Sequence, residues 1–228
     1  MRFDPARVAV YYAPLPEDSL FAASATWLGR DPESGAPAPQ PELAGIAEAT
    51  AEPRLYGFHA TLKPPMRVRH DTGWDALKGA AETLAAGIAP FDLPSLAVSE
   101  IHGFLALRET EPSTQLQALA DVCVAGLDEF RADPTAEEVA RRHRAGLTTA
   151  QDAMLRRWGY PYVFGTWFFH MTLTRRLTAE ERAFYQPAAE HHLARALLEP
   201  RRVTEICLFN QAAPGEPFLI AARLPLRG

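Results

Sequence analysis

Two histidines stand in nearly identical short motifs that suit acid–base chemistry. The first motif is GFHATLK at residues 57–63, and the second is FHMTLTR at residues 169–175. A neutral imidazole can take a proton from water or from a ribose hydroxyl, and an imidazolium can give one to a leaving oxygen. The motifs therefore predict phosphodiester cleavage by an acid–base pair, His59 and His170. The sequence leaves open which of the two is the acid and which the base.

A threonine follows each histidine by two positions, and we predict that both threonines are catalytic. Alternate side chains of a β-strand point to the same face, so each histidine shares a face with its own threonine, giving the pairs His59–Thr61 and His170–Thr172. A hydroxyl can donate a hydrogen bond to a non-bridging phosphate oxygen, where negative charge develops in the transition state.

Four further side chains are candidates for substrate binding. Lys63 and Thr174 continue the polar faces of the two motifs, and Lys63 adds a cation. Arg175 can join them only if a bulge or a strand end turns it toward His170, because regular alternation points it away. Tyr11 is expected to face the groove, since the alternate residues Val8, Val10 and Tyr12 form the more apolar face of that strand.

One His-x-Thr motif has little specificity, but two copies are harder to assign to chance. The histidines lie 111 residues apart, in corresponding places of the two halves, and both have an aromatic residue before them and Thr-Leu after them. The alternative is a duplicated fold in which both histidines are structural.

The order of the predicted elements indicates a duplicated α+β fold. Strands are predicted over residues 8–12, 56–62, 91–98, 101–108, 162–173, 203–210 and 217–224, with Pro64-Pro65 ending the second. Helices are predicted over residues 17–29, 73–87, 113–158 (with breaks near 133–134 and 146) and 179–198. We expect residues 1–228 to form one compact domain of two similar, pseudo-symmetric lobes, one motif in each half of the chain. Antiparallel sheets should line a central groove, with helices outside.

Composition limits the partners. The formal net charge is −5, which gives no electrostatic footprint for a long nucleic acid but allows a small phosphorylated substrate. No apolar run of 18 residues is present, so no membrane association is expected. The two cysteines lie far apart, which is typical of a reducing cytoplasm. The sequence is silent on the oligomeric state.

Known cofactor and metal motifs are missing from the sequence. It contains no GxGxxG, no P-loop and no GxSxG, which argues against dinucleotide, nucleoside triphosphate and serine-hydrolase chemistry. His191-His192 lacks the spacing of a metal-binding pair, so neither a cofactor nor a metal is expected. The arginine-rich segment 134–158 is either a solvated helix face or a phosphate-facing rim over the groove.

The paired motifs resemble those of the two-histidine (2H) phosphoesterase superfamily, which includes cyclic nucleotide phosphodiesterases and 2′-5′ RNA ligase-like proteins. Segments 11–14, 27–31, 56–65 and 168–175 are most similar to a bacterial branch labelled a phosphonate-metabolism protein and associated with carbon–phosphorus lyase genes. The resemblance covers nearly the whole chain. It implies a bilobal α+β fold, catalysis without metal, and the roles given above for the two His-x-Thr pairs. If the pathway association holds, a phosphoribosyl cyclic phosphate is the implied substrate.

Two other functions stay open at this point. The motifs could hold a phosphate ligand without turnover, as in a binding module. Alternatively, the chain could process RNA ends that carry a 2′-phosphate or a cyclic phosphate, although its acidic charge weakens that interpretation.

Overall fold

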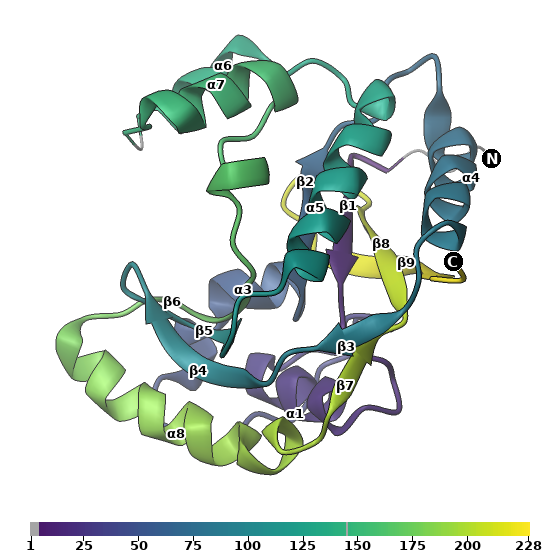
Figure 1. The fold of residues 1–228 in the computed structure, drawn as a ribbon. Helices are drawn as coiled ribbons and strands as arrows, with labels where there is room; N and C mark the ends of the chain where they lie inside the picture. The colour runs from purple at the N-terminus through teal and green to yellow at the C-terminus, as the bar shows by residue number, and fades with distance from the viewer. Residues whose placement is uncertain (1–4, 145) are drawn as a thin grey trace.

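Two antiparallel sheets form the framework in the computed structural model, which describes residues 5–144 and 146–228 (Figure 1). The larger sheet has the strand order β4-β5-β6-β2-β1-β8-β9, and the smaller one pairs β3 with β7. Every pairing between these strands is antiparallel. The strands are β1 (Arg7–Tyr12), β2 (Ala60–Met66), β3 (Phe91–Leu93), β4 (Leu96–Ile101), β5 (Phe104–Glu109), β6 (Met171–Arg176), β7 (Arg201–Val203), β8 (Glu205–Gln211) and β9 (Phe218–Pro225).

Helices surround the larger sheet, and several begin at side-chain caps. They are α1 (Ser19–Leu28), α2 (Ile46–Ala49), α3 (Ala51–Tyr56), α4 (Gly73–Ala86), α5 (Thr114–Gly126), α6 (Ala136–His143), α7 (Thr149–Trp158) and α8 (Ala179–Leu197), with 3-10 turns η1 (Asp128–Phe130) and η2 (Phe164–Thr166). Thr135, Thr148 and Thr178 each form a capping box at the start of α6, α7 and α8. Within the described ranges, no helix is both long and apolar enough to cross a bilayer.

The larger sheet consists of two strand groups that meet at one residue pair. One group is β2-β1-β8-β9 and the other is β6-β5-β4. Ala60 of β2 faces Met171 of β6, and this is the one registered pair between the two groups in the described residues. Each of these residues directly follows a motif histidine. The seam between the two strand groups therefore brings the two motifs together.

The sequence had placed one motif in each half of the chain. The two strand groups do not follow that division. The C-terminal strands β8 and β9 return to pair beside β1, so the first group contains strands from both ends of the chain. β1 is buried from Val8 to Tyr12 and needs a hydrogen-bonding neighbour on each edge, which β2 and β8 supply. The expected α+β fold with antiparallel sheets is confirmed, and one of its strand groups combines strands from both ends of the chain.

The helices cover the two strand groups unequally. Helices α4 and α5 pack against the group that contains β2 and β9, whereas α1 and α8 pack together beside β4 (Figure 1). Trp27 of α1 is fully buried, and its indole N–H donates a hydrogen bond to the Leu173 carbonyl of β6 at 3.0 Å. Helices α6 and α7 stand apart from this body: no residue of α6 is buried, and only Leu155 of α7 is.

Both motif strands begin later than the sequence pattern predicted. Residues 51–56 are helical, and β2 starts at Ala60 and continues through Pro64-Pro65 to Met66. Proline has no N–H group to donate to a neighbouring strand. The two prolines are tolerated because the pairing with β1 is irregular at this point. The segment before β6 is a 3-10 turn and loop rather than a strand, and β6 starts at Met171. His59 and His170 therefore lie at the entrances of their strands.

Candidate active site

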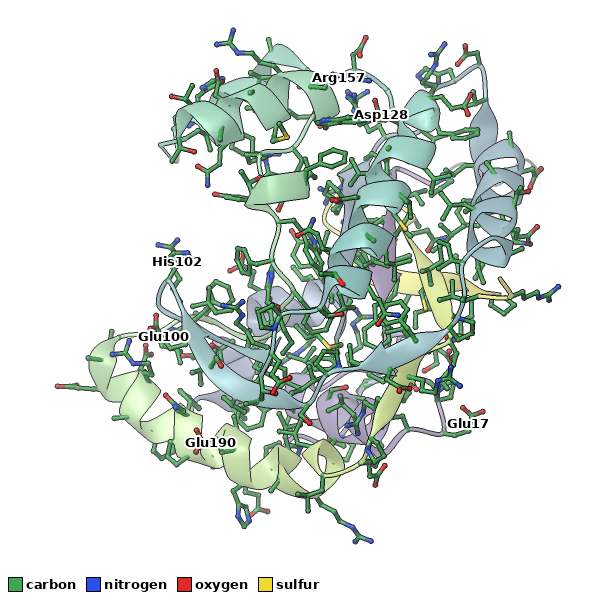
Figure 2. All side chains as sticks on the ribbon, in the orientation of Figure 1. Glu17, Glu100, His102, Asp128, Arg157 and Glu190 are labelled. Atoms are coloured by element: carbon green, nitrogen blue, oxygen red, sulfur yellow. The ribbon has the colours of Figure 1, made fainter. Side chains whose placement is uncertain are left out.

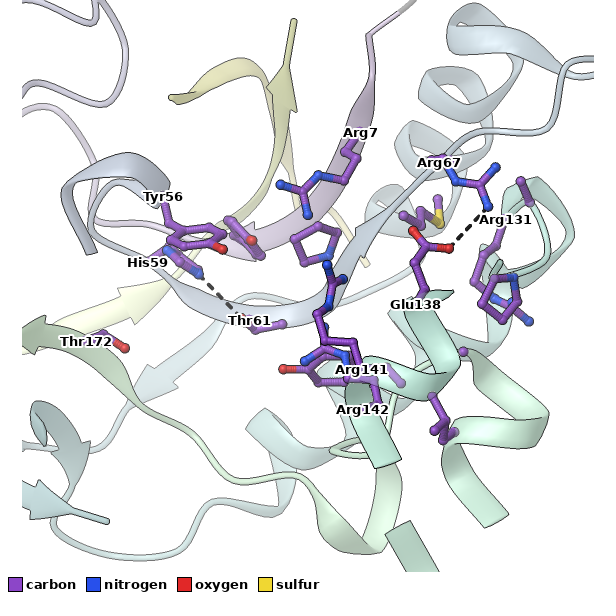
Figure 3. Close-up of a pocket in the computed structure, with 18 of the residues that line it drawn as sticks. Arg7, Tyr56, His59, Thr61, Arg67, Arg131, Glu138, Arg141, Arg142 and Thr172 are labelled. Atoms are coloured by element: carbon purple, nitrogen blue, oxygen red, sulfur yellow. Dashed lines mark hydrogen bonds and ion pairs between the residues drawn. The ribbon is translucent and has the colours of Figure 1, made fainter. Parts of the chain in front are cut away.

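A cavity of about 300 Å³ collects both motifs at the seam of the sheet (Figure 3). Its lining includes both histidines, both threonines and one of the expected binding residues: His59, Thr61, His170, Thr172 and Tyr11. The structure thus brings five of the eight predicted site residues into one pocket. Their action on a substrate stays a prediction at this point.

Strand pairing and a tryptophan hold the first motif in place. Thr61 lies opposite Tyr11 in the pairing of β2 with β1. The indole N–H of Trp167, which comes from the loop before β6, donates a hydrogen bond to the Thr61 carbonyl at 2.7 Å. This bond crosses the seam, so the second motif's own loop helps to position the first motif.

Local hydrogen bonding determines the tautomer of His59. Its Nδ1 lies 2.8 Å from the Gly57 carbonyl oxygen, which can only accept, so Nδ1 carries the hydrogen. In the neutral imidazole, Nε2 is then a free acceptor, and the Thr61 hydroxyl lies 3.4 Å from it. The ring of Tyr11 stacks on the imidazole with centroids 3.7 Å apart and planes 18° apart. A general base requires this arrangement, with one nitrogen held and the other available.

Burial makes His59 a weak base. Desolvation lowers its pKa from 6.5 to about 4, the hydrogen bond to Gly57 opposes this shift, and the charge of His170 adds to it. His59 is therefore neutral at physiological pH. Because a charge on His170 lowers the pKa of His59, the two imidazoles disfavour being protonated together.

His170 repeats the arrangement of His59. Its Nδ1 lies 3.2 Å from the carbonyl oxygen of Phe168. Phe168 lies two residues before His170, just as Gly57 lies two residues before His59. The rings of Phe168 and Phe104 flank the imidazole, with centroids 4.7 and 6.0 Å from its own. Burial lowers the pKa of His170, the bond to Phe168 opposes the shift, and the charge of Arg108 adds to it. Both histidines thus keep Nε2 as the free nitrogen.

Lys63 does not reach the pocket, which corrects the prediction that it binds substrate. In the pairing of β1 with β2, Tyr11 faces Thr61 but Val10 faces Lys63, so Leu62 is the extra residue of a bulge. The bulge breaks the alternation and turns Lys63 into the interior, where 2% of its side chain is exposed. Its ammonium donates to the Val124 carbonyl at 2.9 Å.

The buried ammonium of Lys63 belongs to an ion-pair network around Asp128. The two groups lie 3.5 Å apart, and Asp128 also pairs with Arg131 and with Arg157 of α7 (Figure 2). Burial lowers the pKa of Lys63 to about 8, and Asp128 opposes that shift. This network anchors α7 to the body of the protein, so the role of Lys63 is structural.

Thr174 and Arg175 border an adjoining cavity of about 260 Å³, which also includes His59 and Thr172. Thr174 is buried, and its hydroxyl accepts a hydrogen bond from the Leu105 N–H at 3.0 Å. The pairing of β6 with β5 is irregular between Thr172 and Arg176, which supplies the bulge that Arg175 needs. The Arg175 guanidinium is nevertheless held by Glu181, at 2.7 Å.

Several lining residues gave no signal in the sequence. Arg7, Arg67 and Arg131 lie far from one another along the chain, and only the fold gathers them at the pocket. Arg141 and Arg142 lie in the arginine-rich segment for which a phosphate-facing rim was one of two interpretations. In the described parts of the chain, no three potential metal ligands among His, Cys, Asp and Glu come together.

Gly57 adopts a backbone conformation that only glycine tolerates, and its carbonyl orients His59. Its φ of 75° and ψ of 170° exclude a Cβ, which would also lie 3.0 Å from Cβ of Pro32. We expect Gly57→Ala to lower the free energy of unfolding by about 1–3 kcal/mol. Activity should fall as well, because the displaced carbonyl no longer fixes the His59 tautomer. Urea unfolding and a turnover assay measure the two effects.

Gly79→Ala is the matched control for this prediction. Gly79 lies exposed within α4, a Cβ there meets no atom within 4 Å, and its φ is not positive. Alanine should stabilise the helix by about 0.5–1 kcal/mol and leave turnover unchanged. A Gly57→Ala variant as stable and as active as this control would show that the Gly57 conformation is not needed.

Comparisons with solved structures give weak global similarity. A phosphoesterase crystal structure aligns with a TM-score of 0.48 and 14% identity, covering 99% of this chain and 100% of that chain. Escherichia coli LigT complexed with 3′-AMP aligns with a TM-score of 0.46 and 15% identity, with coverage of 99% and 100%.

Sequence comparison gives closer relatives. The chain is 36% identical over 231 residues to a ribose 1,5-bisphosphate phosphokinase PhnN from Janthinobacterium sp. (strain Marseille), covering 97% of this chain and 51% of that protein. It is 33% identical over 214 residues to a protein of the same name from Laribacter hongkongensis (strain HLHK9), with coverage of 93% and 50%. The chain therefore spans about half the length of these curated relatives. Residues 61–219 match the family described as "Protein of unknown function (DUF1045)", and the chain belongs to that family.

Proposed function

We propose that this chain is a metal-independent phosphoesterase that hydrolyses a small cyclic phosphate or phosphodiester. One observation carries the proposal. Two matching His-x-Thr motifs, 111 residues apart, meet in one cavity, and both histidines bond through Nδ1 to the carbonyl two residues earlier. Two structural histidines would not need the same free nitrogen beside the same cavity. The sequence resemblance to two-histidine phosphoesterases supports the same chemistry.

The two histidines differ in how readily they hold a proton. The pKa of His59 is lowered to about 4, and a charged His170 contributes to that shift. His170 is therefore the imidazole that carries the proton when the pair holds one, and we assign it as the acid. His59 is assigned as the base. A bound phosphate anion raises the pKa of a neighbouring imidazole, so substrate binding itself favours the protonated His170.

The reaction is a single in-line displacement at phosphorus. His59 Nε2 accepts a proton from water, the water oxygen forms a bond to phosphorus, and the opposite phosphorus–oxygen bond breaks. His170 Nε2 gives its proton to the leaving oxygen. The Thr61 and Thr172 hydroxyls donate to the non-bridging oxygens. The 3.4 Å separation between the Thr61 hydroxyl and His59 Nε2 is long for a hydrogen bond, which leaves that hydroxyl free to turn toward a phosphate.

The names of the relatives bear on the substrate. Both are named for phosphorylation of a ribose phosphate, but this chain matches only half of each and contains no P-loop sequence. We assign the kinase reaction to the other half of those proteins. Two activities in one polypeptide commonly act on related compounds, which points to a phosphorylated ribose as the substrate of this chain, within phosphonate metabolism.

Turnover of small cyclic phosphates tests the proposal directly. The panel consists of 2′,3′-cyclic nucleotides and phosphoribosyl cyclic phosphate, assayed with EDTA present. We expect His59→Ala and His170→Ala each to lose at least about 10²-fold in kcat, because each removes one partner of general acid–base catalysis. His191→Ala is the matched control, since His191 is exposed on α8 and lines none of the cavities described here.

Other outcomes of this assay separate the alternatives. Activity that requires added divalent ions would refute the metal-free mechanism. If the wild type binds phosphate but turns over no compound of the panel, the result would support the binding module instead. Retardation of short RNA at physiological salt would favour the processing of RNA ends.

The pH profile tests the acid–base assignment. In the free enzyme, the rate requires neutral His59 and protonated His170. As pH rises, kcat/KM should increase through about pH 4, where His59 loses its proton, and decrease through the pKa of His170, which lies below 6.5. Its maximum should therefore fall on the acid side of pH 6.5.

The profile of kcat should differ from that of kcat/KM. Bound phosphate raises the pKa of His170, so the descending limb of kcat is expected at higher pH than that of kcat/KM. A kcat/KM that still increases above pH 7 would contradict the assignment.

A further inference from the structure

The cavity at the seam carries more positive charge than the chemistry at the two histidines uses. Five arginines line it, against two carboxylates, Glu52 and Glu138. The arginines are Arg7, Arg67, Arg131, Arg141 and Arg142. This lining is unusual for a chain whose formal net charge is −5.

Two of the five arginines already have a carboxylate partner. Arg67 pairs with Glu138 at 3.3 Å, the contact marked by a dashed line in Figure 3. Arg131 pairs with Asp128 at 2.8 Å. These two arginines hold the segment that leads into α6 against the body of the protein.

The other three have no carboxylate partner among the described residues. Arg7 donates through Nε to the Gln211 side chain at 2.7 Å, which positions the guanidinium without neutralising it. The guanidinium of Arg142 lies 4.7 Å from the centre of the Tyr160 ring, also a neutral contact. Arg141 is exposed, and it forms neither a hydrogen bond nor an ion pair with the residues that the structure describes. We call Arg7, Arg141 and Arg142 the arginine set.

The members of the arginine set come from opposite sides of the pocket. Arg7 extends from β1, on the side of the cavity that also carries His59 and Thr61 (Figure 3). Arg141 and Arg142 extend from α6 on the facing side. Three like charges brought to one space repel each other unless an anion lies between them. Holding them there costs stability, and a ligand with matching charge removes that cost.

We propose that the arginine set binds a second phosphate group of the substrate, so that the substrate class is a small cyclic phosphate that also carries a phosphomonoester. This inference rests on the proposed function, since it places the reacting phosphate at the histidines. A guanidinium presents a planar fork of donors that suits phosphate oxygens and keeps its charge at every accessible pH. The cavity, at about 300 Å³, has room for a phosphorylated sugar.

A matched pair of substrates tests this subsite. A cyclic ribose phosphate is assayed with and without a second phosphate on O5. We expect wild-type kcat/KM to be at least about tenfold higher for the two-phosphate compound, since hydrogen bonds to charged groups contribute that much or more. In the double variant Arg141→Gln/Arg142→Gln, this ratio should approach one.

Arg144→Gln is the control for that variant. Arg144 is exposed at the end of the same helix and lines none of the described cavities, so the substrate ratio should keep its wild-type value. Equal rates of wild type on both compounds, with both histidines still required, would overturn the second subsite while leaving the proposed function intact.

Binding to a catalytically dead protein separates the subsite from turnover. In His59→Ala/His170→Ala, calorimetry compares ribose 1,5-bisphosphate with ribose 5-phosphate and with ribose 1-phosphate. A bisphosphate affinity at least about tenfold above that of either monophosphate, and lost on adding Arg141→Gln/Arg142→Gln, supports the arginine set even if no tested compound is hydrolysed. Equal affinities for all three ligands would overturn it.

Discussion

A single residue pair, Ala60 with Met171, joins the two strand groups of the sheet, and the site depends on it. Because each partner directly follows a histidine, this pairing sets the relative position of the two imidazoles. Two indole N–H groups add hydrogen bonds near this pair. Trp167 donates to the Thr61 carbonyl across the seam, and Trp27 of α1 donates to the Leu173 carbonyl of β6. The cavities of about 300 and 260 Å³ are each lined by both motifs, with His59 from the first motif and Thr172 from the second.

Desolvation is the second constraint, and it shapes the chemistry of the pair. Both imidazoles are flanked by aromatic rings, Tyr11 at His59 and Phe168 at His170, and burial lowers the pKa of both. The same desolvation strengthens the interaction of a protonated imidazole with a phosphate anion. In the proposed reaction, an anionic substrate would therefore favour the protonated form of the imidazole beside it.

The sequence predicted the parts of the site that depend on local patterns. The pairing of each histidine with its threonine was predicted from strand alternation, and all four residues line one cavity, although each histidine lies just before its strand. Lys63 was misplaced because a bulge, a property of the pairing with β1, reverses alternation there. The membership of the first strand group was not predicted for a similar reason: the return of β8 and β9 to β1 is a long-range pairing with no local signal. Arg7 was missed because nothing near it in the chain marks it as a site residue.

The surroundings of the motifs are less symmetric than the motifs themselves. One side of the groove carries the arginine set, whereas the other is a larger cavity of about 710 Å³ lined by aromatic side chains such as Tyr162, Trp167 and Phe168. Thr61, Tyr160 and His170 border both sides. The two imidazoles are held in similar ways, so unequal walls would help to orient a substrate between them. Under the proposed function, the wall that holds the charged part of the substrate would determine which oxygen of the reacting phosphate faces His170, and therefore which bond breaks.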